Sequence, residues 1–258
     1  MKQEFAALNR AYWGKRAEGY SKVNQEELAT GQRRVWGQEL AQAIARQWPG
    51  RPAQEICVLD VGTGPGFFAI VLAELGYRVT AVDATPEMLA QAKGNAGPLA
   101  SRIRFVSMDA QALAFDEGVF DVVVSRNVTW NLHRPERAYG EWVRVLRPGG
   151  LLLNFDANWY RYLFDDQAQA AHRRDRENVT LEGVEDDTAG TDVTAMEAIA
   201  RRAPLSSQLR PEWDEQVLRA LGMGVEIDCQ AWRRLWTRCE RVNNASTPMF
   251  RVMGVKQR

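Results

Sequence analysis

Short apolar segments alternate with helical segments through the middle of this chain. Five of the apolar segments predict β-strands, at residues 58–61, 78–82, 103–107, 120–125 and 151–155. The fourth, Phe-Asp-Val-Val-Val-Ser, has the nearly continuous apolar character of a strand that is buried on both faces. Strands that alternate with helices predict an α/β fold with a parallel, doubly wound sheet. In such a sheet the carboxyl ends of the strands share one edge, and ligands bind there.

Residues that begin or end helices fall between these strands. Thr85 is suited to cap a helix whose first turn begins at Pro86, and Pro135 begins another helix that reaches about Leu146. The segment Arg147-Pro148-Gly149-Gly150 predicts a turn before the fifth strand. These signals support the alternation of strands and helices.

The pattern divides the chain into four parts. Residues 1–50 are helical by pattern and precede the first strand, and residues 51–156 contain the alternating strands and helices. Residues 157–210 have a helical composition without a convincing strand, which predicts an insertion or cap. Residues 211–258 predict one helix followed by two further strands that complete the sheet.

The glycine-rich segment after the first strand is the most specific chemical signal. Asp60 and Val61 are followed by Gly62-Thr63-Gly64-Pro65-Gly66 and then by an apolar helical pattern. A strand, a tight loop and a helix start in this order hold an adenosine cofactor over the end of a parallel sheet. A dinucleotide loop has glycine at its sixth position, where this chain has Phe67. This difference disfavours a nicotinamide-dependent oxidoreductase.

The G-x-G-x-G pattern behind Asp60 resembles the first motif of the class I S-adenosylmethionine (SAM) methyltransferases. Three further landmarks match that family in order: Asp83 ends the second strand, Asp109-Ala110 follows the third, and Arg126-Asn127 follows the fourth. The resemblance covers about residues 56–156. It implies a Rossmann-like sheet of seven strands, mostly parallel with the last strand antiparallel, with helices on both faces and a helical insertion after strand five.

The resemblance also implies the cofactor and its contacts. SAM would be the methyl donor and S-adenosylhomocysteine (SAH) the product. The carboxylate of Asp83 would accept hydrogen bonds from both ribose hydroxyls, and Asp109 would accept one from the adenine amino group. The N-terminal segment would fold over the cofactor or simply pack on the sheet. The expected cofactor contacts are Tyr20, Asp60, Gly62, Thr63, Gly64, Gly66, Asp83, Ala84, Met88, Asp109, Ala110, Arg126 and Asn127.

Candidate residues for the methyl acceptor lie after the fourth and fifth strands. Methyl transfer from a sulfonium is an in-line displacement with a neutral leaving group, so alignment and loss of water supply much of the acceleration. A general base is needed only if the acceptor must lose a proton. His133 is the candidate for such a base, or it caps the following helix. The expected acceptor contacts, each of which could instead serve the core or a loop, are Trp13, Trp130, Asn131, Asp156, Asn158 and Tyr160.

The amino-acid composition limits the kinds of partner that we expect for this chain. The chain has 33 Lys and Arg against 33 Asp and Glu, so it has no basic surplus for nucleic acid. The Asn-Pro-Pro-aromatic tetrapeptide of enzymes that methylate nucleic-acid amino groups is replaced by Ser125-Arg126-Asn127-Val128. Three cysteines without CxxC spacing predict neither disulfides nor a metal site. No apolar run approaches the roughly 20 residues that cross a bilayer. We therefore expect a cytoplasmic monomer or homodimer that uses no membrane and no nucleic acid.

Three functions stay open at this point. The first choice is a SAM-dependent methyltransferase with a small-molecule acceptor, whose attacking atom is oxygen, nitrogen, sulfur or carbon. The second is a module that binds SAM or SAH without turnover. The third is a methyltransferase that acts on a macromolecule.

Overall fold

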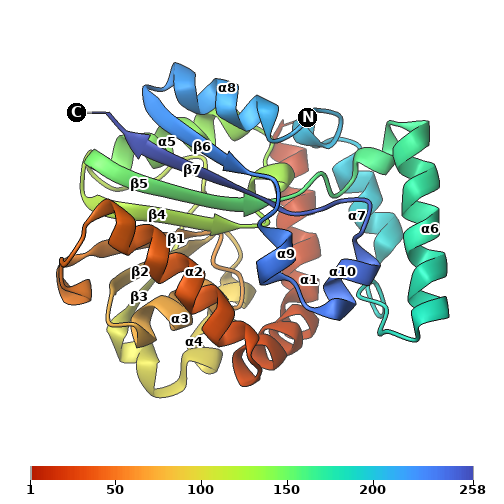
Figure 1. The fold of residues 1–258 in the computed structure, drawn as a ribbon, viewed down its shortest axis with the longest axis horizontal. Helices are drawn as coiled ribbons and strands as arrows, with labels where there is room; N and C mark the ends of the chain where they lie inside the picture. Colours follow the sequence, from red (N-terminus) through yellow and green to blue (C-terminus); the bar gives the residue numbers. More distant parts are fainter. Residues whose placement is uncertain (1, 258) are drawn as a thin grey trace.

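The protein is described by a computed structural model that covers residues 2–257, with side chains from residue 4 onward. Its centre is a seven-stranded sheet with the strand order β3-β2-β1-β4-β5-β7-β6 (Figure 1). The strands are β1 (Cys57–Val61), β2 (Arg78–Asp83), β3 (Ile103–Ser107), β4 (Phe120–Arg126), β5 (Leu146–Asp156), β6 (Met223–Asp228) and β7 (Phe250–Lys256). Strands β1 to β5 pair in parallel, and β7 is antiparallel to both β5 and β6. The predicted fold class is confirmed.

Helices cover both faces of this sheet (Figure 1). The helices are α1 (Lys2–Ala29), α2 (Gln32–Gln47), α3 (Phe67–Glu74), α4 (Pro86–Ala96), α5 (Pro135–Val145), α6 (Asp166–Glu182), α7 (Val193–Ala200), α8 (Glu212–Ala220), α9 (Trp232–Leu235) and α10 (Arg238–Asn243). Short 3-10 turns lie at Ala53–Glu55, Gly97–Arg102, Thr129–Asn131, Arg161–Leu163 and Pro204–Ser206. None of the helices among residues 2–257 has an apolar stretch long enough to cross a bilayer.

The sheet is buried between two apolar clusters. On one face, Trp36 of α2 packs with Phe68 of α3 and with Phe155 of β5, at ring-centroid distances of 5.2 and 5.0 Å. On the other face, α5 contributes Tyr139 and Trp142, and α8 packs beside them. Burial on both faces explains why β4 reads as a continuous apolar run, since every residue from Phe120 to Ser125 is buried.

Two elements lie beyond the carboxyl ends of the parallel strands. Helix α1 packs against α4 and α7, and α6, which lies in the same segment between β5 and β7 as α7, packs against α10 (Figure 1). These helices leave the strand ends covered on the side where ligands bind in this class of sheet. The covered edge is therefore the place to look for a site.

Two local expectations are corrected. The predicted turn at 147–150 lies inside β5, which begins at Leu146 and not at 151. Gly149 has a left-handed φ of 75°, and the pairing with β4 shifts register between Phe120 and Val122. A β-bulge of this kind lets a strand continue through a segment with turn-like composition. The segment between β6 and β7, for which no helix was predicted, forms α9 and α10.

Candidate functional site

A cavity of about 490 Å³ opens at the carboxyl ends of the central strands. Its wall includes Asp60 of β1, Asp83 of β2 and Arg126 of β4, together with Asp109 beyond β3. From there the cavity continues between α1 and the helices α6 and α7. The volume lies within the range of about 300–1,000 Å³ that is usual for small-molecule sites.

The glycine loop between β1 and α3 is the floor of the cavity. Gly62, Gly64 and Gly66 all have left-handed backbone angles, with φ of 67°, 53° and 96°. A Cβ atom on Gly62 would lie 2.3 Å from Cγ2 of Val128, so this position has no room for one. At Gly64 the nearest atom would be 3.7 Å away, so the angle alone requires glycine there.

Gly66 serves the packing of the loop instead of contacting the cavity. It precedes α3, and a Cβ there would lie 3.0 Å from Cβ of Ala92 in α4. The cavity wall contains Gly62, Thr63 and Gly64 but not Gly66. The residue lets the start of α3 approach α4, and its expected contact with the ligand stays a prediction.

Asp83 joins β2 to the glycine loop. Its Oδ2 accepts a hydrogen bond from the Gly64 amide at 2.9 Å, and its Oδ1 accepts one from the Thr85 amide at 2.8 Å. Burial raises the pKa of this carboxyl above its usual value. The Thr85 hydroxyl and the Ala84 amide also donate to this carboxyl, so the start of α4 and the glycine loop hold it in place together.

Asp60 lies deeper in the same wall. It is 2 % exposed, and its Oδ2 accepts a hydrogen bond from the Thr63 hydroxyl at 2.6 Å. Burial raises the pKa of Asp60 to about 7, and the nearby Asp83 adds to the shift. Asp60 therefore changes its charge near neutral pH, and a bound cation would favour its ionised form.

Asp109 and its neighbours form the side of the cavity beyond β3. The Oδ1 atom of Asp109 accepts hydrogen bonds from the amide and the side-chain nitrogen of Gln111, at 2.9 and 3.0 Å. Ala84, Met88 and Ala110 also line the cavity there. This mixture of one carboxylate with apolar side chains suits a flat, hydrogen-bonding ring.

Arg126 and Asn127 are consecutive residues at the end of β4, but Arg126 binds helix α1 whereas Asn127 presents a polar atom at the cavity. The guanidinium of Arg126 makes two hydrogen bonds of 2.8 Å to Glu27 of α1 and lies 4.7 Å from the centre of the Phe67 ring. Asn127 has a φ of 59°, the left-handed value that asparagine tolerates better than most residues. Its buried Oδ1 has no hydrogen-bond partner within residues 2–257, and the residue lines the cavity. Asn127 is thus the member of this pair with an acceptor available to a ligand.

One face of α1 lines the cavity along most of the helix. The residues of this face recur every three or four positions: Phe5, Asn9, Tyr12, Trp13, Arg16, Tyr20 and Asn24. Trp13 and Tyr20 are predicted site residues, whereas Asn9, Arg16 and Asn24 are not among the residues that the sequence predicts. Their helical spacing from the two aromatic residues was the signal that could have found them.

Aromatic rings line the part of the cavity away from the glycine loop. The ring centroids of Trp130 and Tyr160 are 4.8 Å apart, and those of Tyr160 and Tyr162 are 5.9 Å apart. His172 of α6 stacks on Tyr162 at 3.9 Å and was not predicted. Burial lowers the pKa of His172, and the charge of nearby Arg176 lowers it further.

His133 and Asn131 also lie on the cavity wall, as the sequence analysis expected of site residues. The ring of His133 is 5.9 Å from that of Phe5, and Asn131 is 8 % exposed. Whether His133 acts as a base depends on the acceptor, so its catalytic role stays a prediction.

Asp156 and Asn158 do not line the cavity, so their expected contact with the acceptor stays a prediction that this cavity does not support. Asp156 is fully buried, and its Oδ2 accepts hydrogen bonds from the Trp130 amide at 3.0 Å and from Arg210 at 2.7 Å. The side-chain nitrogen of Asn158 donates a hydrogen bond of 2.8 Å to the backbone carbonyl of Arg210. Arg210 also pairs with Asp214. Asp156 thus holds the Trp130 amide, and Arg210 connects Asp156 with Asn158 and Asp214.

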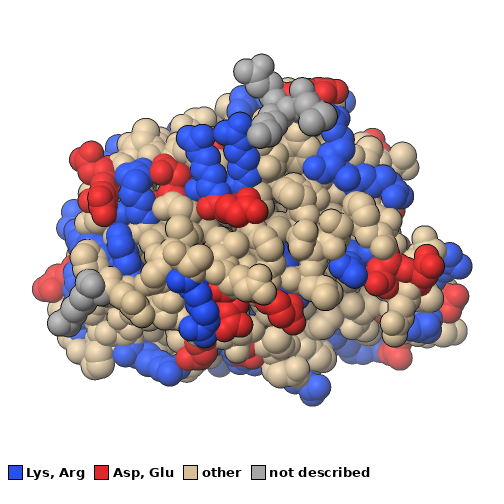
Figure 2. Space-filling view, turned by 90° about the horizontal axis from the view of Figure 1, so that it is seen from above, with Lys and Arg blue, Asp and Glu red and all other residues tan. Residues whose placement is uncertain are grey.

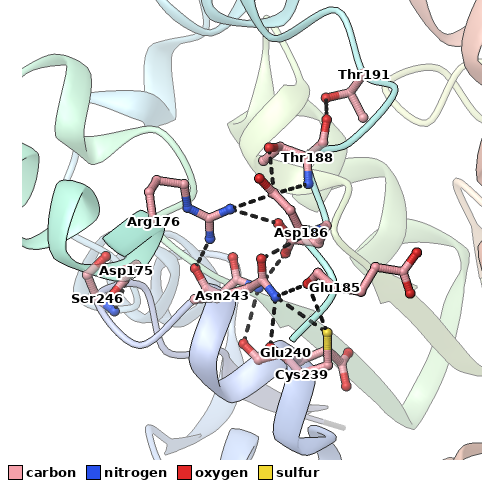
Figure 3. A network of polar contacts seen from close by, with 12 residues as sticks. Asp175, Arg176, Glu185, Asp186, Thr188, Thr191, Cys239, Glu240, Asn243 and Ser246 are labelled. Atoms are coloured by element: carbon pink, nitrogen blue, oxygen red, sulfur yellow. Dashed lines mark hydrogen bonds and ion pairs between the residues drawn. The ribbon is translucent and has the colours of Figure 1, made fainter. Parts of the chain in front are cut away.

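A polar network fixes the outer wall of the cavity (Figure 3). Asn243 of α10 donates to the Glu185 carbonyl at 2.8 Å and accepts from the Asp187 amide at 3.1 Å. Arg176 of α6 bonds to the Asn243 carbonyl and to Asp186. Asp187 and Arg176 both line the cavity, so these bonds connect its wall to the segment before β7.

Positive and negative side chains are mixed on the surface, as the equal numbers of basic and acidic residues would suggest. Figure 2 shows basic and acidic side chains interspersed on the face that it presents, with apolar and uncharged surface between them. Among residues 2–257, no group of three or more His, Cys, Asp or Glu side chains is arranged to hold a metal ion.

Comparison with known proteins places this geometry in a family. Residues 59–154, which run from β1 into β5, match the family model described as a methyltransferase domain. These residues form a methyltransferase domain. The motif around Asp60, with Asp83, Asp109 and the residues after β4, lies entirely within this domain.

The relatives share this domain more than the rest of the chain. An uncharacterized methyltransferase of Mycobacterium sp. (strain JLS) is 40% identical over 114 residues, which are 44% of this chain and 42% of that protein. The matches cover less than half of the length of the first curated relatives. The flanking segments, which supply α1 and α6 to the cavity, lie outside the methyltransferase domain match.

Two solved structures share the overall fold. A methyltransferase from Haloferax volcanii, in complex with the Trm112 methyltransferase activator, has a TM-score of 0.58 and 19% identity, and covers 95% of this chain and 98% of that chain. Phosphoethanolamine N-methyltransferase 2 from Haemonchus contortus, in complex with phosphomonomethylethanolamine and SAH, has a TM-score of 0.56 and 17% identity. It covers 86% of this chain and 53% of that chain. At these identities the similarity shows the fold alone.

Proposed function

We propose that this protein is a SAM-dependent methyltransferase that transfers a methyl group to a small molecule by in-line displacement. The observation that carries the proposal is the placement of three carboxylates, Asp60, Asp83 and Asp109, in one cavity with the glycine loop. They stand at or just beyond the ends of three adjacent parallel strands. A nucleoside with a positively charged amino-acid tail fits this order of acceptors along the sheet edge.

The residues present fit SAM. Asp83 offers two acceptor oxygens to ribose hydroxyls, and the alanines at positions 84 and 110 leave room for a flat base beside Asp109. Asp60 and the unpartnered Oδ1 of Asn127 are acceptors for an ammonium group. The left-handed glycines allow the loop backbone to approach the ligand closely.

The chain's own residues would align the reactants and exclude water. SAM, when bound, supplies an electrophilic methyl group on a sulfur that leaves as a neutral thioether. Tyr20 of α1 and the rings of Trp130 and Tyr160 would cover the reacting centre, so that the acceptor meets the methyl group without competing water. No covalent attachment to the protein is needed.

Enclosure of the cavity supports a small-molecule acceptor. Helix α1 covers one side, and the wall that carries Arg176 and Asp187 covers another, so the acceptor must fit between them. The interspersed surface charges provide no extended basic groove on the face seen in Figure 2. Both observations favour a compact acceptor over nucleic acid.

A macromolecular acceptor is the second candidate. The observation that favours it is the likeness to the Haloferax volcanii methyltransferase, which extends over 95% of this chain and whose structure contains a protein activator. A module that binds SAH without turnover would retain the same cofactor contacts. The three candidate functions differ in whether the protein releases SAH and in which class of acceptor is needed for that release.

The test combines binding and turnover. Calorimetry should show saturable binding of SAM and SAH and none of NAD. The protein is then incubated with SAM and a cell extract that has been divided by ultrafiltration into small molecules and macromolecules. SAH release with the small-molecule fraction supports the proposal, and release with only the macromolecular fraction supports the second candidate. Binding without release from either fraction indicates a silent module, and a preference for NAD contradicts the cofactor assignment.

A further inference from the structure

Besides Oδ1 of Asn127 and Nε of Arg176, three buried polar atoms on the cavity wall have no hydrogen-bond partner among the residues that the structure describes. They are the Oδ1 atoms of Asn9 and Asn131 and the indole Nε1 of Trp13. Asn131 itself is only 8 % exposed. Buried polar groups are almost always paired in folded proteins, so an exception that lines a cavity marks a place for a ligand group.

The three residues are neighbours. The side-chain nitrogen of Asn9 donates to the backbone carbonyl of Asn131 at 3.1 Å, which joins α1 to the turn after β4. Asn9 and Trp13 are four positions apart in α1, and such residues lie next to each other on one face of a helix. The ring of Trp130, which precedes Asn131, lies 4.8 Å from that of Tyr160. The free atoms therefore lie close to an aromatic wall.

The identity of these atoms limits the ligand. The two amide oxygens only accept hydrogen bonds, and the indole nitrogen only donates one. A carboxylate lacks hydrogens for the oxygens, and an ammonium lacks a lone pair for the indole. A carboxamide supplies two N–H groups and a carbonyl, which matches the two acceptors and the donor in number.

Given the proposed function, on which this inference rests, we propose that the methyl acceptor is a ring compound with a neutral carboxamide-like group. The group binds to Asn9, Trp13 and Asn131, and the ring packs beside Trp130 and Tyr160. Arg10 and Arg16, which also line the cavity, make an acid the competing ligand. The amide anchors the acceptor, and another atom of the molecule receives the methyl group.

The experiment uses three probes of similar size on the full-length protein saturated with SAH. Benzamide, benzoate and benzylamine are titrated and followed by ligand-observed NMR. We expect benzamide to bind at least tenfold more tightly than the other two. The Trp13→Phe variant keeps an aromatic ring but removes the indole N–H group. The Asn131→Leu variant removes the acceptor oxygen and keeps a side chain of similar volume. Each should weaken benzamide at least fivefold without changing SAH affinity, whereas the control Trp48→Phe, outside the cavity, should change neither.

The outcomes separate this inference from the proposed function. Equal binding of the three probes, no binding of any, or a preference for benzoate or benzylamine would overturn the inference while SAH binding stands. A loss of SAH affinity in Trp13→Phe would assign the indole to the cofactor and would also overturn it. Failure of the unaltered protein to bind SAH would contradict the proposed function itself.

Discussion

Arg126 of β4 and Glu27 of α1 form a two-bonded ion pair that joins the central sheet to the helix above the cavity. Both N–O distances are 2.8 Å, and the side chains are only 13% and 15% exposed. The guanidinium also lies over the ring of Phe67, the first residue of α3. Helix α1, which carries the face that lines the cavity, is thus fixed to the end of β4.

Replacing Glu27 by Gln should loosen this connection. The change leaves a buried guanidinium without its counter-charge, which costs about 3 kcal/mol in typical cases. We expect a lower free energy of unfolding, faster hydrogen exchange within α1 and weaker binding of SAH. The matched control is Glu18→Gln on the same helix, because Glu18 forms an exposed pair with Lys22 that contributes little. Equal exchange rates in the two variants would contradict the role of the pair.

Asp83→Ala should weaken SAH binding by roughly 1–3 kcal/mol, the usual contribution of charged hydrogen bonds. The loss has two sources, since the carboxylate would bind the ribose and also holds the Gly64 amide. Calorimetry at constant pH measures it, with the exposed Asp116→Ala as the control. A folded Asp83→Ala protein with unchanged affinity would refute the assignment of this acid.

Asp60 predicts a pH dependence with opposite signs for binding and stability. Its pKa of about 7 lies above the ordinary value of 3.8, so the folded protein holds this proton more tightly than the unfolded chain does. The stability that Asp60 contributes is therefore present at low pH and is lost as pH rises from about 4 to about 7. Binding of the SAH ammonium favours the carboxylate and releases the proton, so affinity should fall between pH 8 and pH 6.

The measurement is calorimetry of SAH at pH 6, 7 and 8 in two buffers with different ionisation enthalpies. Proton release should be found at pH 6 and should vanish by pH 8. In Asp60→Asn, binding should be weaker and this proton release absent. Its unfolding temperature should also lose the part of the pH dependence that Asp60 causes. The same affinity at all three pH values would exclude Asp60 from the ammonium site.

Two glycines of the loop should differ in their tolerance to alanine. Gly64→Ala meets only the left-handed backbone angle, which costs about 1–2 kcal/mol. Gly62→Ala meets the same angle and also Val128, so it should unfold at a lower temperature than Gly64→Ala. Thermal unfolding checks the order, and Val128→Ala in the same chain should recover part of the loss at position 62. No recovery would show that the contact is not the cause.

Arg210 should be needed for stability although it does not line the cavity. Its side chain is fully buried between Asp156 and Asp214, so Arg210→Met leaves two buried carboxylates without a cation. Removal of one partner from such a pair costs about 3–5 kcal/mol, which denaturant titration measures. The exposed Arg219→Met in α8 is the control, with an expected change near zero.

The sequence predicts the strand ends of the site better than its covering helices. Asp60, Asp83 and Asp109 each follow an apolar run, and a parallel sheet brings the ends of such runs to one edge. Asp156 also lies at that edge, at the end of β5, but its position there did not make it part of the cavity wall. Its partner, Arg210, lies 54 residues further along the chain, and only the folded structure shows that the two meet.

The inner face of α1 escaped prediction for a different reason. Helix-forming sequences are recognised by an apolar stripe, but this face mixes asparagines and an arginine with aromatic residues because it borders a cavity. Asn9 and Asn24 therefore look like solvent-facing positions. The side chain of Asn9 binds the distant turn after β4, and Asn24, which is 2 % exposed, binds Glu27, which is itself paired with Arg126 of β4.

The contact between Gly62 and Val128 links two loops that leave neighbouring strands. During evolution, the size of the residue at position 62 therefore limits the size of the residue at position 128, and the reverse also holds. A homologue that gains a methyl group at the first position should carry a smaller residue at the second, and a bulkier residue at the second should keep the first bare. Paired replacement of this kind across an alignment would be the inherited trace of a space that holds only one of the two.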